Sequence, residues 1–104
     1  MEARERYDEL VDDLCARNDD VEPSQMMGMP CVKRSGKMVA GFTRGAMVFK
    51  LPDRDAHARA LALDGAHLFE PMAGRPMKAW VQVPPTHETQ WAELAREAEA
   101  GVER

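Results

Sequence analysis

Cysteine, histidine and aromatic residues are all scarce in this sequence. It contains two cysteines, three histidines and only three phenylalanines, two tryptophans and one tyrosine. Two cysteines are too few for a disulfide framework, and no apolar run approaches the ~20 residues that span a bilayer. The charged stretch Met1–Arg6 lacks the apolar segment of a signal peptide. We therefore expect a cytoplasmic protein that makes no contact with a membrane.

The chain is short and moderately apolar. Its 104 residues have a mass of 11.7 kDa, and 44% of them are hydrophobic and 31% charged. This composition is typical of a globular protein, and the length suits one domain over 1–104. A chain of this size forms one core and leaves little volume for a deep enclosed pocket.

The net charge of −4 is unevenly distributed. Residues 1–25 carry nine acidic and three basic side chains, whereas residues 26–80 carry nine basic and four acidic ones. An acidic chain is a poor general ligand for nucleic acid, which requires many phosphate contacts. Direct nucleic-acid binding is therefore not expected, although a local basic surface in the middle of the chain is compatible with the pattern.

Hydrophobic periodicity predicts three helices and five strands. Apolar residues at helical spacing, such as Tyr7, Leu10 and Leu14, indicate helices, and alternating runs separated by glycine turns indicate antiparallel strands. The predicted helices span 3–19, 53–63 and 87–100, and the predicted strands span 29–34, 37–43, 46–51, 67–72 and 77–83. The expected fold class is α+β, in the order α-β3-α-β2-α, with a mainly antiparallel five-stranded sheet. Each helix has one apolar stripe, so all three should cover one sheet face.

Alternation along the strands predicts which residues lie on each face of the sheet. The core-facing set is Met38, Ala40, Phe42, Met47, Phe49 and Leu51. The opposite face forms a candidate interaction surface made of Val39, Gly41, Val48, Lys50, Lys78 and Trp80. We also expect burial of Leu10, Leu14, Met38, Phe42, Phe49, Leu61, Val81, Trp91 and Leu94. Trp80 is either an exposed interface anchor or a residue that folds over the edge of the core.

No arrangement of residues in the sequence indicates a catalytic or metal centre. The sulfur atoms of Met26, Met27, Met29 and Cys31 would suit a soft metal, but their spacing favours adaptable packing. The histidines His57, His67 and His87 fall on different predicted elements and lack ligand spacing. Cys31 would need a neighbouring base to act as a nucleophile, and it is interpreted as a buried strand residue. We expect no cofactor, no metal and no catalysis.

Basic residues give one candidate anion site. A glycine turn and two cations meet in Gly74–Lys78, although the phosphate-binding P-loop pattern is absent. The candidate anion contacts are Lys33, Arg34, Lys37 and Arg75. Solvated charges that protect strand edges are the alternative interpretation of the same residues.

Several short motifs resemble the N-terminal domain of the TfoX/Sxy competence-regulator family. In order along the chain they are Met27-Gly28-Met29-Pro30-Cys31, Gly36-Lys37, Ala40-Gly41-Phe42, Lys50-Leu51-Pro52, Phe69-Glu70-Pro71, Gly74-Arg75-Pro76-Met77-Lys78 and Trp80-Val81. The resemblance covers roughly residues 7–100. It implies an α-β3-α-β2-α fold similar to secretion chaperones and no known catalytic residues. The best-known members, which carry a second helical domain, regulate competence genes alongside another transcription factor.

The sequence therefore predicts a non-catalytic interaction or regulatory module of the TfoX N-terminal type. Its expected partner is a second copy of the chain or another protein, and the resemblance links it to transcriptional regulation. The alternative is a small enzyme or anion-binding protein that uses the basic 74–78 turn and the Cys31 region.

Overall fold

The computed structural model describes residues 2–26, 28–72 and 74–101. The three α-helices are α1 (Ala3–Arg17), α2 (Arg54–Leu61) and α3 (Glu88–Ala100), and a 3-10 turn, η1 (Pro85–His87), precedes α3. The six strands are β1 (Val21–Met26), β2 (Met29–Arg34), β3 (Lys37–Thr43), β4 (Ala46–Lys50), β5 (His67–Met72) and β6 (Arg75–Val83).

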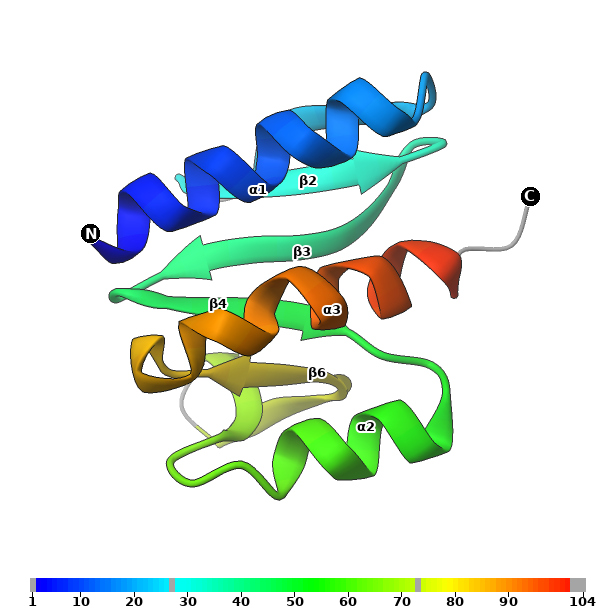
Figure 1. Cartoon of the computed structure of the whole chain (residues 1–104). Helices are drawn as coiled ribbons and strands as arrows, with labels where there is room; N and C mark the ends of the chain where they lie inside the picture. The colour runs from blue at the N-terminus through cyan, green and yellow to red at the C-terminus, as the bar shows by residue number, and fades with distance from the viewer. Residues whose placement is uncertain (1, 27, 73, 102–104) are drawn as a thin grey trace.

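The strands form one sheet that the helices cover on a single face. The strand order is β1-β2-β3-β4-β6-β5, and every neighbouring pair is antiparallel. Figure 1 shows α1 over the β1–β2 side of this sheet, α3 across its middle and α2 beside β6. The predicted α+β class and antiparallel sheet are confirmed, but the predicted five strands are wrong because the sheet has six. No helix within the described ranges is long and apolar enough to cross a bilayer.

The additional strand, β1, lies where the sequence suggested only the end of a helix. It pairs with β2 from Val21 opposite Arg34 to Met26 opposite Met29. Of its residues only Val21 is buried, and Pro23 lies within it, so it has neither apolar alternation nor a full set of hydrogen-bond donors. Such a strand is stable at a sheet edge, because an edge strand has a neighbouring strand on one side only. A missing N–H donor or an exposed side chain is therefore tolerated on its other side.

The helix-covered side of the sheet holds the main core. Phe49, Val81 and Trp91 are fully buried there, and Leu10, Leu14 and Leu94 are nearly so. Phe42 is only partly buried and packs against Tyr7, with ring centroids 5.4 Å apart. The predicted burial of Leu61 is wrong, since 37% of its surface is exposed. The short helix α2 instead faces the sheet with Ala56 and Ala60.

We expect Asp53→Ala to lower the free energy of unfolding by about 1 kcal/mol. Asp53 is the N-cap of α2, and its carboxylate accepts a hydrogen bond of 2.9 Å from the backbone N–H of Ala56. Urea unfolding would measure the change, with the exposed Asp55→Ala as a control in the same first turn. An equal effect of both substitutions would contradict the capping role.

Candidate functional site on the uncovered sheet face

The sheet face opposite the helices, called here the second face, is defined by the strand register. Cys31, Gly41, Val48 and Gln82 are successive cross-strand partners on β2, β3, β4 and β6. Directly paired residues point to the same side of a sheet, so these four form one row. Val48 belongs to an apolar cluster separate from the helix-covered core, which places this row on the second face.

A β-bulge changes the predicted faces of two residues in β3. Val32 pairs with Ala40, but the next residue, Lys33, pairs with Met38, so Val39 is an extra residue in β3. A bulge breaks the two-residue alternation on its strand. Val39 is therefore buried in the helix-covered core, and Met38 packs on the second face. The prediction was wrong for both residues, and Val39 is not part of the candidate interaction surface.

Gly41 lies on the second face, but the space above it is filled by the chain itself. A β-carbon built on Gly41 would lie 2.7 Å from the terminal methyl carbon of Met29 and 3.3 Å from that of Met38. Both thioether side chains therefore lie close to the Gly41 backbone. The absence of a side chain at Gly41 makes room for these methionines, so the glycine does not expose a bare backbone to a partner.

Three residues form the centre of the second face. Val48, Phe69 and Trp80 pack together, and the rings of Phe69 and Trp80 have centroids 6.4 Å apart. Trp80 is buried, which favours the packing interpretation over an exposed interface anchor. The register of the β5–β6 pairing shifts on both sides of Phe69. Since Val48 has no exposed surface, the predicted surface is not a flat apolar patch.

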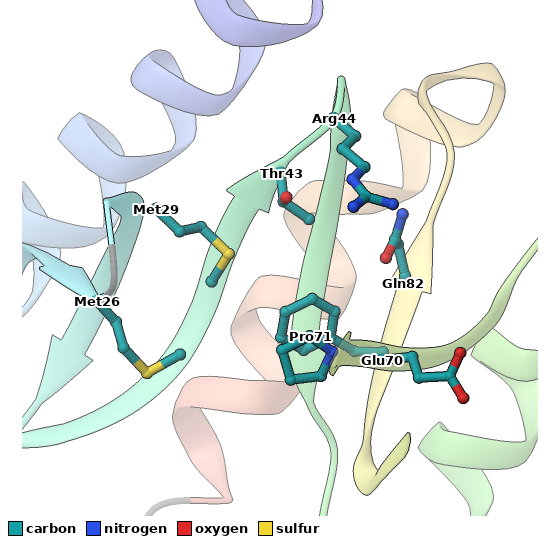
Figure 2. Close-up of a pocket in the computed structure, with 8 residues that line it drawn as sticks. Met26, Met29, Thr43, Arg44, Glu70, Pro71 and Gln82 are labelled. Atoms are coloured by element: carbon teal, nitrogen blue, oxygen red, sulfur yellow. The ribbon is translucent and has the colours of Figure 1, made fainter. Parts of the chain in front are cut away.

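A cleft of about 160 Å³ opens on the second face beside this cluster. Its apolar lining is Met26, Met29, Phe69 and Pro71, and its polar lining is Thr43, Arg44, Glu70 and Gln82. Figure 2 shows the thioethers of Met26 and Met29 on one side and Arg44 extending toward Gln82 on the other. The β1–β2 hairpin, the β3–β4 turn and β5 thus meet around one site, although their lining residues are far apart in sequence.

Arg34 is a structural residue rather than an anion contact. It is only 3% exposed, and its guanidinium donates to Asp20 at 3.1 Å and to the carboxylate and backbone oxygens of Glu99 at 2.8 and 3.2 Å. Hydrogen bonds from Arg34 and Ser35 hold the pKa of Asp20 below its ordinary value. The predicted anion contact at Arg34 is therefore wrong, because its side chain is buried and already pairs with two carboxylates.

The other predicted anion contacts do not converge on one small anion. Lys33 lies on β2 and Arg75 on β6, with β3 and β4 between them in the sheet. Three strand spacings amount to about 14 Å. Lys37, Lys50 and Lys78 lie at the same end of the sheet, as the antiparallel register requires. Within the described ranges, none of these five cations makes an ion pair within 4.0 Å.

The histidines and cysteines do not assemble into a reactive group. His57, His67 and His87 each make a hydrogen bond to a different backbone carbonyl, those of Lys78, Leu68 and Asp64. In the part of the chain that the structure describes, no three or more histidine, cysteine, aspartate or glutamate side chains gather as metal ligands.

Cys31 is 1% exposed, and burial raises the pKa of its thiol despite the opposing effects of Lys33 and Ser24. A buried thiol with a raised pKa is a poor nucleophile. In the sheet, β3 and β4 separate Cys31 from the 74–78 turn. Met27, part of the soft-metal hypothesis, lies outside the described residues.

No protein-family model, curated protein or solved structure matches this chain significantly. The resemblance to the TfoX/Sxy N-terminal domain therefore stays a prediction from the sequence motifs.

Sequence reasoning did not anticipate the cleft. Phe69-Glu70-Pro71 and the Met26–Met29 segment were noted as motifs, but nothing in their spacing relates them to Arg44 or Gln82. A signal was nonetheless present, since four of the eight methionines (Met26, Met29, Met72 and Met77) lie in the β1–β2 and β5–β6 hairpins. Methionine is enriched at surfaces that adapt to several partners.

Proposed function

We propose that this chain is a non-catalytic protein-interaction module that acts through its second face. The observation that carries the proposal is the composition of that face, where a methionine-lined cleft and a buried apolar cluster adjoin cations that make no ion pair with any described residue. Every ion pair among the described residues includes a residue of α1, a residue of α3 or Arg34, whose side chain lies on the helix side of the sheet. An apolar centre with a charged rim is the usual anatomy of a protein interface.

The edges of the sheet are less suited to binding a partner than its face. The edge strands β1 and β5 each contain a proline, Pro23 and Pro71. Proline has no N–H to donate, so it interrupts the ladder that an added strand would need. Pairing of a partner's strand along either edge is thereby disfavoured, which leaves the face as the better docking surface.

The motif resemblance supports a regulatory role of the TfoX N-terminal type, exercised through a protein partner and connected to transcription. A second copy of the chain is the simplest such partner. Helices α1 and α3 expose carboxylates such as Asp12 and Glu93, whereas Lys50 and Lys78 lie on or beside the second face without ion partners among the described residues. Opposite charges on two surfaces of one chain favour a contact between copies that weakens with salt.

We expect the protein to form a dimer at micromolar concentration. Reversing both charges in Lys50→Glu/Lys78→Glu should weaken the dimer at least about tenfold, because it replaces attraction by repulsion across the contact. Sedimentation-velocity ultracentrifugation over a concentration series would measure the dissociation constant. Val48→Glu is unsuitable for this purpose, because Val48 is fully buried and the variant would destabilise the monomer.

A matched control reverses two charges on the helix-covered side, in Arg17→Glu/Arg96→Glu. Both residues are exposed on helices, and among the described residues the one ion pair that either makes is the exposed pair of Arg17 with Asp13. Equal weakening by the two double variants would contradict a contact through the Lys50–Lys78 region. A wild-type protein that remains monomeric at high concentration would remove the homodimer and leave a different protein as the partner to be captured.

A further inference from the structure

We infer that the cleft on the second face receives one aromatic side chain of a different protein, with a carboxylate of that partner held by Arg44. This inference rests on the proposed interaction function and names the chemistry of the partner. The cleft lies near the β3–β4 turn, whereas Lys50 and Lys78 lie toward the other end of the sheet. Occupation of the cleft and a dimer contact through those lysines can therefore be tested separately.

The size of the cleft limits its occupant to a single ring. Its volume is about 160 Å³. A protein cavity of about 150 Å³ accommodates a benzene molecule, whereas sites for drug-sized ligands and cofactors usually occupy about 300 Å³ or more. A phenylalanine or tyrosine side chain fits this volume, and a nucleotide or a flavin does not.

The apolar wall of the cleft suits an aromatic ring. Met26 and Met29 contribute thioethers, and Phe69 and Pro71 contribute further apolar lining from β5. Sulfur–aromatic contacts are favourable, and unbranched methionine side chains adjust to the shape of a guest. Pairs of aromatic rings gain further stabilisation in tilted arrangements, which Phe69 already adopts with Trp80.

The polar wall of the cleft suits a carboxylate. Arg44 is exposed, lies in the β3–β4 turn and has no carboxylate within 4.0 Å among the described residues. Figure 2 shows its guanidinium extending toward the Gln82 amide, with the Thr43 hydroxyl nearby. Guanidinium, amide and hydroxyl groups all donate hydrogen bonds. A single arginine guanidinium pairs with a carboxylate through two parallel N–H hydrogen bonds. Glu70, at the β5 side, disfavours a second acid there.

The occupant belongs to a different protein because a second copy has no suitable side chain to offer. In the described ranges, the exposed large hydrophobic residues are Leu61 and Met72, and neither is aromatic. The chain's aromatic side chains are all buried or partly buried within its own clusters. The inferred partner segment therefore presents an accessible phenylalanine or tyrosine beside an aspartate or glutamate.

The probe for this inference is 3-phenylpropionate, which joins one ring to one carboxylate. With ¹³C-methyl-labelled methionine, NMR titration should shift the Met26 and Met29 methyl signals and leave the signal of Met47, buried in the helix-covered core, unchanged. A ligand of this size should bind with a Kd on the order of 1 mM. The uncharged 3-phenylpropanamide should bind about tenfold more weakly, because it lacks the charge that Arg44 recognises.

Two variants assign the two walls. Arg44→Asn should remove the preference for the acid over the amide while retaining binding of the ring. Asparagine tolerates the left-handed backbone of Arg44, where φ is 50°, so the turn is preserved. Lys37→Asn, at the far end of the sheet, should change nothing. Met26→Glu should abolish binding of both probes, and an unchanged melting temperature would show that the fold is intact.

Absence of shifts at Met26 and Met29 would overturn the inference, as would an unchanged acid preference in Arg44→Asn. A dimer that still responds to Lys50→Glu/Lys78→Glu would then leave the proposed interaction function standing. Conversely, specific binding of the probe to a protein that remains monomeric would support the cleft and remove the dimer. Peptides with phenylalanine followed by aspartate, compared with the same peptides carrying alanine or asparagine, would extend the result to a protein segment.

Discussion

Phe49→Ala should lower the free energy of unfolding by about 3–5 kcal/mol. Phe49 lies on β4 and has no exposed surface in the helix-covered core. It pairs with Ala40 on one side and Val81 on the other, both of which are also fully buried. Removing the ring loses its transfer free energy and leaves a cavity that paired strands cannot close.

Chemical denaturation monitored by tryptophan fluorescence would measure this loss, because Trp91 lies in the same cluster. Leu61→Ala is the matched control, since Leu61 was predicted to be buried but is 37% exposed, and its loss should cost less than about 1 kcal/mol. Comparable effects of the two substitutions, or an unchanged midpoint and slope for Phe49→Ala, would contradict the described core.

Arg34→Ala should lower the free energy of unfolding by about 3 kcal/mol. Arg34 connects β2 to the C-terminal part of α3 through Glu99 and to the α1–β1 connection through Asp20. Its removal leaves the largely buried Glu99 carboxylate without a counter-charge, and an unpaired buried charge is costly. Arg17→Ala, which breaks an exposed pair with Asp13, should cost no more than about 0.5 kcal/mol.

The same substitution should alter how stability depends on pH. Arg34 and Ser35 lower the pKa of Asp20 in the folded state below its unfolded value. The contribution of Asp20 is therefore complete above the unfolded pKa of roughly 4 and is lost as the pH falls through the lower folded pKa. Denaturation midpoints would be measured from about pH 6 to about pH 3, a range that brackets the unfolded pKa. As the pH falls, the midpoint should decrease less steeply for Arg34→Ala than for the wild-type protein. Parallel pH profiles would contradict the pairing.

Arg34 has a structural role, whereas the role inferred for Arg44 is functional. Both are arginines in the basic middle of the chain, and the sequence grouped Arg34 with the anion contacts. Arg34 points to the helix side, where it is buried and pairs with Asp20 and Glu99. Arg44 lies on the rim of the cleft with its donors available to a partner's carboxylate. The difference arises because each residue's neighbours come from elements distant in sequence.

The sequence by itself determined most of the elements and the covered face of the sheet. Helical spacing in α1 and α3 and alternation in β4 are local patterns, because the 3.6-residue and two-residue periods follow from backbone geometry. The strand predicted over 67–72 matches β5, and those over 29–34 and 37–43 match β2 and β3. Local patterns failed at β1, where Pro23 and a mostly exposed strand give no alternation to detect.

Only the tertiary structure decided what the second face presents. The bulge that buries Val39 and turns Met38 outward depends on pairing between β2 and β3. The cleft exists because two hairpins and a turn, whose lining residues run from Met26 to Gln82 along the chain, meet on one side of the sheet. Neighbours brought together by strand order leave no periodic trace in the sequence. Local periodicity therefore identified the fold class, whereas long-range register placed Arg44 beside Gln82 and Met29 over Gly41.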